Sequence, residues 1–225
     1  MTEKPPIIRL DEVTRVYPTT AGEVRALDRV SLDVRPGEFM ALMGPSGSGK
    51  STLLRLIGCL DTPTTGDVLI NGHSATALSD DGLAALRRDH IGFVFQQGNL
   101  LPRLSILENI QFPLSLRDRR DGARERCLEV LSAVGLSPDL LARRPEDLPG
   151  GEQQKVAIAR ALVNDPGILL CDEPTGALAS GTGEALMGLL ADLNRKGKTI
   201  LLGTHDPRIA GIAGRIIRIT DGRIS

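Results

Sequence analysis

Residues 44–51 read GPSGSGKS, and this glycine-rich stretch constrains the fold more than any other part of the chain. It follows a short apolar run, residues 38–44, and precedes leucines at helical spacing, which predicts the order strand, loop, helix. In that context the pattern G-x-x-x-x-G-K-[ST] predicts a loop whose backbone N–H groups surround phosphate oxygens at a helix N-terminus. We therefore expect a phosphate-binding site at the end of a buried strand.

Two side chains of this loop are expected to carry its chemistry. Lys50 would reach the β- and γ-phosphates of a nucleotide, and the Ser51 hydroxyl would bind Mg²⁺. The alternative, an ordinary strand-to-helix turn with an incidental Lys-Ser pair, fits the flanking pattern less well. The expected nucleotide-binding residues are Gly44, Pro45, Ser46, Gly47, Ser48, Gly49, Lys50, Ser51 and Thr52.

An acidic pair supplies the second half of such a site. The run ILLCDE, residues 168–173, predicts a strand that ends at Asp172, whose carboxylate can reach Mg²⁺ through water. Glu173 beside it is placed to polarise an attacking water as a general base. Alone, an acidic pair after a strand is more often a solvated loop, and the phosphate loop favours the functional interpretation.

Strands and helices alternate at both ends of the chain, which predicts a parallel sheet with crossover helices. The predicted fold is a single α/β domain of the P-loop NTPase type, residues 1–225. It would have a mainly parallel core sheet, an N-terminal antiparallel β subdomain and an inserted α-helical subdomain. The expected core covers about 1–85 and 165–225, and the helical subdomain about 86–164. Strands are expected at 7–13, 30–36, 38–44, 66–73, 167–174 and 198–205.

Local signals mark several element boundaries. Asn71 and Gly72 predict a tight hairpin turn. Ser105 and Glu108 have the spacing of a capping box at a helix start. Gly135 is placed to end an amphipathic helix.

A second glycine-rich helix start occurs at residues 148–162, LPGGEQQKVAIARAL. Together with the phosphate loop, ILLCDEPTG and ILLGTHD, in this order, it resembles the ATPase subunits of ABC transporters over essentially the whole chain. The resemblance implies that ATP and Mg²⁺ bind at the interface of two such subunits, either a homodimer or a heterodimer. Each subunit would direct one helix start to its partner's ATP. The corresponding residues here are Pro149, Gly150, Gly151 and Glu152.

Three further residues match positions of the family. Gln96 in IGFVFQQ corresponds to the glutamine that contacts Mg²⁺ and the attacking water, although the neighbouring Gln97 is an alternative assignment. His205 in GTHD resembles the histidine that contacts the γ-phosphate and orients the water. Tyr17 in RVYPT resembles the aromatic residue that stacks on adenine, with a core role as its alternative. The resemblance thus implies Glu173, His205 and Gln96 as catalytic residues.

Two positions depart from the family pattern, and both would face the partner subunit. Pro149 replaces the usual serine, so a hydroxyl and a backbone N–H directed at phosphate are lost. Ala179 replaces the usual aspartate. We expect normal MgATP binding but slow hydrolysis by a homodimer, and faster hydrolysis with a partner subunit that has an intact signature.

Composition excludes several other classes of protein. The 27 basic and 28 acidic residues give a formal charge of −1, so no overall field favours nucleic acid. Cys59, Cys127 and Cys171 form no metal or redox motif and are expected to be buried thiols. The N-terminal residues do not predict a signal peptide, and no apolar run approaches the roughly 20 residues of a membrane span. We expect a cytoplasmic protein bound to the inner face of the cell membrane through a permease.

The sequence favours one function and leaves an alternative. It resembles the ABC subfamily of lipoprotein-releasing, macrolide-efflux and cell-division systems, which implies an ATPase that energises a transmembrane permease. The alternative is an ATP-dependent regulatory module that switches a membrane partner without transport, since switching requires closure but little turnover. A DNA-repair or translation ATPase would carry long coiled coils or two cassettes, and a simple P-loop kinase would not need the second helix start or His205.

Overall fold

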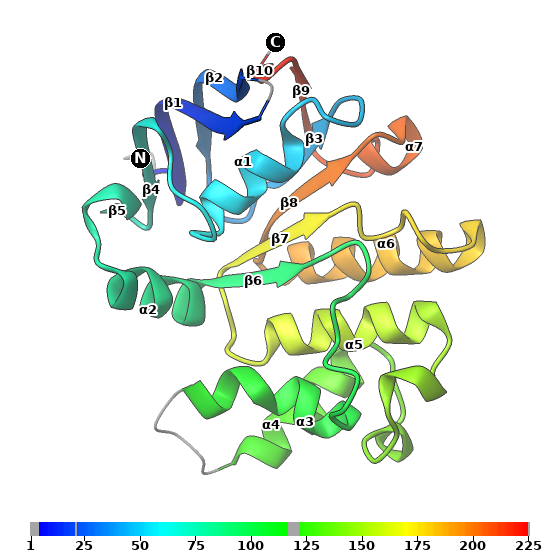
Figure 1. Ribbon diagram of the computed structural model, residues 1–225. Coiled ribbons are helices and arrows are strands. Elements are labelled where there is room, and N and C mark those ends of the chain that lie inside the picture. Colours follow the sequence, from blue (N-terminus) through cyan, green and yellow to red (C-terminus); the bar gives the residue numbers. More distant parts are fainter. Residues whose placement is uncertain (1–4, 21, 117–121, 225) are drawn as a thin grey trace.

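Two sheets lie on either side of one helix, α1, which covers Lys50–Ile57 (Figure 1). The computed structural model describes residues 5–20, 22–116 and 122–224. The antiparallel sheet has strand order β2-β1-β4-β5, and the second sheet has order β10-β9-β3-β8-β7-β6. The strands are β1 Ile8–Thr19, β2 Gly22–Val34, β3 Phe39–Met43, β4 Thr65–Ile70, β5 His73–Ser74, β6 Ile91–Val94, β7 Ile168–Asp172, β8 Thr199–Thr204, β9 Arg215–Thr220 and β10 Arg223–Ile224.

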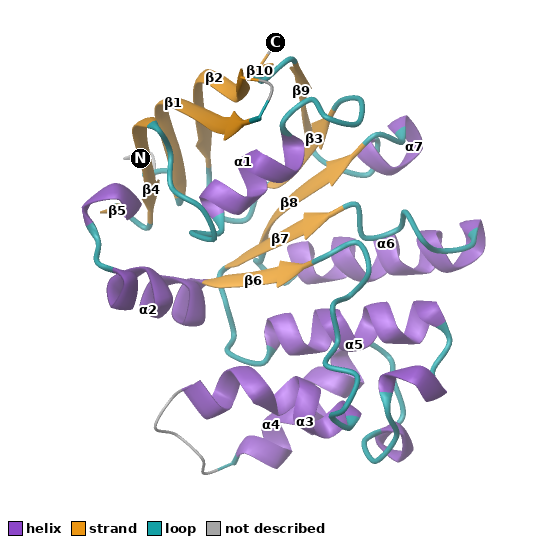
Figure 2. Ribbon diagram, viewed as in Figure 1, coloured by secondary structure: helices purple, strands orange, loops and turns teal. Residues whose placement is uncertain are grey.

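The helices fall into distinct layers around the second sheet. Figure 2 shows strands through the upper and middle parts of the molecule and only helices at its lower end, where α3, α4 and α5 lie together. The helices are α1 Lys50–Ile57, α2 Asp80–His90, α3 Ile106–Gln111, α4 Ala123–Ala133, α5 Gly150–Leu162, α6 Ser180–Arg195 and α7 Pro207–Ala210, with short 3-10 turns at Ala75–Ala77, Phe112–Leu116, Pro138–Leu140 and Pro145–Asp147.

The central strands are buried on both faces, which explains their nearly continuous apolar sequence. Because side chains alternate along a strand, Leu170 and Leu201 pack with α1 and the antiparallel sheet. Leu169 and Leu202 point the other way and pack with α5 and α6. Neighbouring strands from β9 through β3, β8 and β7 to β6 run parallel, and among the described strands of this sheet only β10 is antiparallel to its neighbour. The predicted mainly parallel α/β fold with an antiparallel subdomain is confirmed.

The helical insertion begins later than the sequence predicted. Residue 86 lies inside α2, and the following segment, β6, pairs with β7 in the central sheet. The four residues of β6 are too few to show a clear periodicity, and they include Gly92. A Cβ on Gly92 would lie 2.6 Å from the Ala161 carbonyl oxygen, so glycine lets α5 approach the strand closely. The start of the insertion therefore moves from about 86 to the segment after Val94.

The antiparallel hairpin at the N-terminus is longer than the two predicted strands. β1 and β2 pair from Ile8–Val34 to Thr19–Gly22, with irregularities where Glu12 and Arg29 have positive φ. These bulges break the alternation of apolar and polar residues that would have extended the predicted strands.

Several local predictions are confirmed. Asn71 and Gly72 both have positive φ between β4 and β5, as a tight hairpin requires. Ser105 and Glu108 form a complete capping box at α3, and Gly135 follows α4 with φ 70°. The three cysteines are buried and free. Within the described ranges, no helix combines the length and apolar character needed to cross a membrane.

Candidate active site

The phosphate loop connects β3 to α1 as the sequence predicted. Gly49 precedes the helix with φ 111°, and Gly47 also has positive φ. Gly44 is required for a different reason, because a Cβ there would lie 2.2 Å from the Ile219 carbonyl oxygen. A hollow of about 120 Å³ opens beside the loop, lined by Ala26 and by residues of the loop and first helical turn. The first N–H groups of α1 therefore point into a backbone-lined cradle suited to an anion.

Lys50 is held inside this cradle. Its side chain is only 4% exposed, and Nζ donates to the carbonyl oxygens of Gly44 at 2.8 Å and Pro45 at 2.9 Å. Nζ also lies 3.7 Å from Glu173 Oε1. The ammonium group is therefore fixed between the loop backbone and the acidic end of β7, where an anion entering the loop would meet it.

Glu173 lies at the turn that follows β7. Its φ is 49°, a left-handed conformation that a glutamate adopts at a cost of roughly 1–3 kcal/mol. Its N–H donates to the Gly203 carbonyl oxygen at 2.9 Å, which ties the turn to β8. His205, just beyond the end of β8, brings Nδ1 to 2.7 Å from Glu173 Oε2. Each carboxylate oxygen of Glu173 is thus contacted by a side chain from a different element.

The surroundings of Asp172 show whether this site suits a divalent cation. Burial raises the pKa of Asp172, and a hydrogen bond from Ser51 opposes that shift. Among the described residues, Asp172 Oδ1 is buried without a hydrogen-bond partner. No group of three or more His, Cys, Asp or Glu side chains within the described ranges could enclose a metal by itself. A single carboxylate and a hydroxyl fit Mg²⁺, which keeps several waters and binds substrate phosphates.

Gln96 lies close to the same acidic turn. It follows β6, and its Nε2 is 2.9 Å from where a Cβ on Gly176 would lie. Gly176 belongs to the turn after Glu173, and its N–H donates to the Glu173 carbonyl oxygen. Gln96 therefore contacts the turn that carries Glu173.

The second glycine-rich helix start lies away from the phosphate loop. Pro149 is the N-cap of α5, and its carbonyl oxygen accepts hydrogen bonds from the N–H groups of Glu152 and Gln153. Gly150 and Gly151 follow in the first turn, where N–H groups have no intrahelical partner. In Figure 1 this end of α5 lies in the lower half of the molecule, whereas the loop before α1 lies in the upper half. The starts of α1 and α5 therefore lie apart within one chain.

Ala179 and Tyr17 also lie at defined positions. Ala179 is the N-cap of α6, and its methyl group makes no side-chain cap hydrogen bond. Tyr17, near the outer end of β1, is half-buried, and its hydroxyl donates to Asp61 Oδ2 at 2.6 Å. Neither residue touches Glu173 in the interactions described above.

The C-terminal hairpin supports the phosphate loop, a contact that the sequence did not predict. The Gly222 N–H donates to the Ser48 carbonyl oxygen at 3.0 Å, and the Asp28 N–H donates to the Gly222 carbonyl oxygen at 2.9 Å. Asp28 is 8% exposed, and it also pairs with Arg223 at 2.6 Å. The Asp-Gly pair at 221–222 was an available turn signal, although it does not reveal what the turn contacts.

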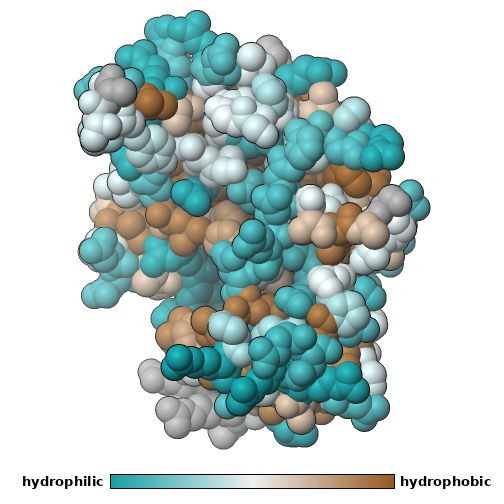
Figure 3. Space-filling model, turned by 45° about the vertical axis from the view of Figure 1, so that its right-hand side comes forward, coloured by the Kyte–Doolittle hydropathy of each residue, from teal (hydrophilic) through white to brown (hydrophobic). Residues whose placement is uncertain are grey.

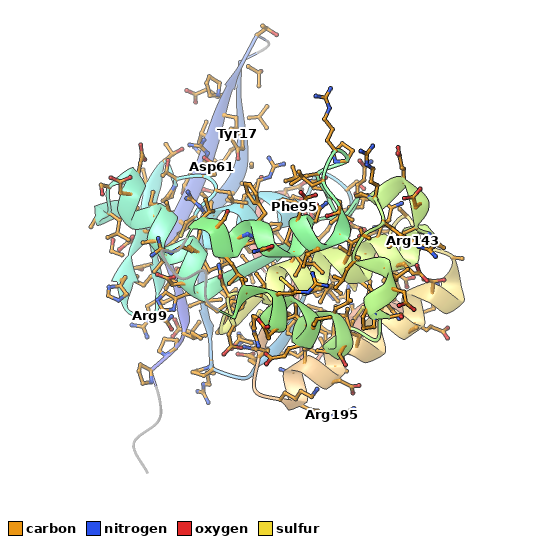
Figure 4. All side chains as sticks on the ribbon, turned by 90° about the horizontal axis from the view of Figure 1, so that it is seen from below. Arg9, Tyr17, Asp61, Phe95, Arg143 and Arg195 are labelled. Carbon is orange, nitrogen blue, oxygen red and sulfur yellow. The ribbon has the colours of Figure 1, made fainter. Side chains whose placement is uncertain are left out.

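A groove of about 420 Å³ lies between β6 and the helical insertion. Phe93 and Phe95 stack in it with ring centres 4.3 Å apart, and Phe95 is labelled in Figure 4. Phe112 and Leu116 also line it and remain 47% and 59% exposed. On the face shown in Figure 3, apolar side chains form separate patches between hydrophilic regions. A larger hollow of about 980 Å³ lies around Arg9 and contains none of the predicted site residues.

Comparison with known proteins agrees with this geometry. A family model described as ABC transporter matches residues 27–176, which include the phosphate loop and Glu173. The chain is 49% identical to the macrolide export ATP-binding/permease protein MacB of Hyphomonas neptunium, over 98% of this chain and 34% of that protein. It is 48% identical to the uncharacterized ABC transporter ATP-binding protein MJ0796 of Methanocaldococcus jannaschii, over 97% of this chain and 95% of that protein. The chain thus spans about a third of the length of the MacB relative.

The fold also matches a solved structure closely. The dimeric structure of a post-hydrolysis state of the ATP-binding cassette MJ0796 bound to ADP and Pi has a TM-score of 0.90 and 47% sequence identity. The match covers 97% of this chain and 96% of that chain.

Proposed function

The chain belongs to the ABC transporter family, and on that premise we propose that it binds and hydrolyses ATP to drive a membrane permease. The observation that carries this proposal is the position of Glu173, whose carboxylate lies between Lys50 and His205 beside the phosphate loop. This arrangement combines a phosphate site, a base and a residue that orients the base.

ATP would bind through the loop of residues 44–52. The backbone N–H groups at the start of α1 would donate to phosphate oxygens, and Lys50 would exchange its loop carbonyl partners for the phosphates. Tyr17 would stack on the adenine ring, since an aromatic face attracts any base. Ser51, Asp172 and Gln96 would hold Mg²⁺, which when bound neutralises charge on the phosphate oxygens.

Hydrolysis requires a water aimed at the γ-phosphate. Glu173 would accept a proton from that water, and its strained backbone and two side-chain contacts hold the carboxylate in place. His205 would orient Glu173 through Nδ1 and face the γ-phosphate with its other nitrogen. Gln96, against the same turn, would contact the water from the side of β6.

A second ATPase subunit would complete the site. The start of α5, with Pro149, Gly150, Gly151 and Glu152, lies apart from the loop of its own chain and would reach the ATP of a partner. The dimeric solved structure of the similar cassette MJ0796 supports this arrangement. Pro149 offers neither a hydroxyl nor an N–H, so the composite site of a homodimer would be slow.

The permease would dock at the groove beside β6. Its half-exposed Phe112 and Leu116 offer an apolar surface next to the segment that carries Gln96, so docking and hydrolysis would share one segment. The name of the MacB relative, which joins ATP-binding and permease parts, supports such a partner. Through that contact the protein would lie on the inner face of the cell membrane. A purely regulatory role has less support, because that relative is named as an export protein.

A paired binding and hydrolysis measurement tests the proposal. The wild-type protein, alone and with its permease, should bind ATP and release phosphate, with faster release in the complex. Glu173→Gln should retain ATP affinity and lose at least about 100-fold in hydrolysis, because an amide cannot accept the proton of water. Equal hydrolysis by wild type and Glu173→Gln would contradict the assignment of Glu173 as the base.

A further inference from the structure

The ring of Tyr17 is fixed by two residues that no motif identifies. The Tyr17 hydroxyl donates to Asp61 Oδ2 at 2.6 Å, and the guanidinium carbon of Arg15 lies 4.5 Å from the ring centre. Figure 4 labels Tyr17 and Asp61 and shows them in the same part of the molecule. One contact fixes the edge of the ring, and the other covers one of its faces.

Arg15 and Asp61 also fix each other. Arg15 contacts the carboxylate through two nitrogens, with Nε 3.0 Å from Oδ2 and Nη2 2.7 Å from Oδ1. The Thr62 N–H donates to Oδ1 at 2.8 Å. The side chains of Arg15 and Asp61 are 23% and 18% exposed, so water screens the pair less than a surface ion pair. The carboxylate accepts from donors on both oxygens and has one well-defined orientation.

The backbone connects this cluster to the phosphate loop. The Thr64 N–H donates to the Thr14 carbonyl oxygen, and the Val16 N–H donates to Thr64 Oγ1. The segment 61–64 therefore lies directly against β1. This segment follows α1, which begins at Lys50. The helix α1 is about 12 Å long and rigid, so it fixes the distance between the segment and Lys50. The ring of Tyr17 is thus held at a fixed offset from the loop that would bind phosphate.

We propose that Arg15 and Asp61 are positioning residues that hold the Tyr17 ring for stacking by the base of the bound nucleotide. This inference rests on the proposed function, in which Tyr17 stacks on adenine. Because Arg15 covers one face of the ring, the base takes the opposite face, and the ring is pre-oriented for it. The cluster therefore increases affinity for a base-bearing nucleotide and leaves affinity for free polyphosphate unchanged.

The chain offers a direct spectroscopic readout. It has no tryptophan and one tyrosine, so intrinsic tyrosine fluorescence reports on Tyr17 alone. Titration with Mg-ADP should change this emission as the base stacks, whereas inorganic pyrophosphate should bind, as judged by its displacement of ADP, without that change. Both probes avoid hydrolysis during the measurement.

Asp61→Asn is the decisive variant, with Asp33→Asn as its matched control. Asp33 pairs with Arg9 across β1 and β2 at 2.9 Å but touches neither Tyr17 nor Arg15 in the interactions of the described residues. Asp61→Asn should weaken ADP binding roughly tenfold, the scale of losing one stacked base, and leave pyrophosphate affinity within twofold. Asp33→Asn should change neither. An equal loss for both ligands, or no loss for ADP, would overturn the inference.

A double variant distinguishes positioning from general stability. In a Tyr17→Leu background there is no ring to hold, so Asp61→Asn should cause no further loss of ADP affinity by calorimetry. An additional loss of the same size as in the wild-type background would overturn the inference. If the wild-type protein bound neither ADP nor pyrophosphate, the proposed function would fail, and this inference with it.

Discussion

His205 Nδ1 lies 2.7 Å from Glu173 Oε2, and this pair joins the ends of two neighbouring parallel strands. With Nδ1–H donating to the carboxylate, the other ring nitrogen takes no part in this pair. The opposite carboxylate oxygen of Glu173 lies 3.7 Å from Lys50 Nζ. The Glu173 carboxylate therefore lies between His205 on one side and Lys50 of the phosphate loop on the other.

Removing the His205 imidazole should lower ATP hydrolysis and leave ATP affinity nearly unchanged. His205→Ala should lower ATP hydrolysis by about 10²–10³-fold, because Glu173 loses the donor that orients it and the γ-phosphate loses a contact. ATP affinity should change by less than about threefold, since the loop contacts are intact. His73→Ala removes an exposed histidine on β5 and serves as the control, with unchanged hydrolysis. Phosphate-release assays and ATP titrations measure both quantities. A parallel loss of affinity and hydrolysis would contradict this role.

The lowered pKa of Asp206 should make the stability of the fold depend on pH. Hydrogen bonds from Arg208 lower the pKa of Asp206 to about 2. A folded pKa below the unfolded value of about 3.9 stabilises the protein above pH 4, and this stabilisation is lost as pH falls toward 2. Asp206→Asn should therefore lower the urea midpoint more at pH 6 than at pH 3. A midpoint difference that is the same at both pH values would show that Asp206 does not contribute through its charge.

The sequence predicted the parts of the site that are contiguous in the chain. The phosphate loop and the pair Asp172 and Glu173 each follow a buried apolar strand, and parallel strands place their carboxyl ends at one edge of the sheet. His205 follows a third such strand. Local pattern and strand direction predicted the positions of the loop and the acidic pair, whereas the family resemblance was needed to single out His205.

The parts that the sequence did not predict depend on contacts between distant segments. The Gly222 N–H donates to the Ser48 carbonyl oxygen, and every residue type except proline has such an N–H. In the sequence nothing distinguishes Asp61 from other loop aspartates, and the structure shows that it accepts a hydrogen bond from Tyr17. The strand β6 was missed because four residues carry too little periodicity, and α5 packs against its glycine.

Serine, the usual residue of the family at this position, can replace Pro149 without a change in the backbone. Its φ of −57° and ψ of 150° suit a serine N-cap equally well. Pro149→Ser combined with Ala179→Asp should raise hydrolysis by the homodimer roughly tenfold to a thousandfold, because the serine restores a hydroxyl and an N–H directed at phosphate, each of which contributes about 1.5–3 kcal/mol. ATP affinity of the isolated chain should stay the same. Equal turnover of the wild type and the double variant would refute the prediction that these positions limit hydrolysis.

Ala179→Asp alone should also stabilise α6. Ala179 is the N-cap, with an extended backbone at φ −63° and ψ 149°, and an aspartate there can accept from N–H groups of the first turn. The expected gain in unfolding free energy is about 0.5–2 kcal/mol, favoured further by the helix dipole. Ala177→Asp places the same charge on an exposed residue outside the helix and should give no gain. Chemical denaturation measures the difference, and equal stability of the two variants would exclude a capping effect.

Alanine substitutions at Gly222 and Gly72 can be compared to test whether the C-terminal turn supports the phosphate loop. Both have left-handed φ, 75° and 78°, so alanine is strained at either position by roughly 1–2 kcal/mol. A Cβ on Gly72 meets nothing within 4 Å, whereas a Cβ on Gly222 would lie 2.7 Å from the Ala26 carbonyl oxygen. Gly222→Ala must therefore displace the turn that donates to Ser48, and it should weaken ATP binding several-fold. Gly72→Ala should lose stability but keep ATP affinity. Equal ATP affinity of both variants would show that the loop does not depend on this turn.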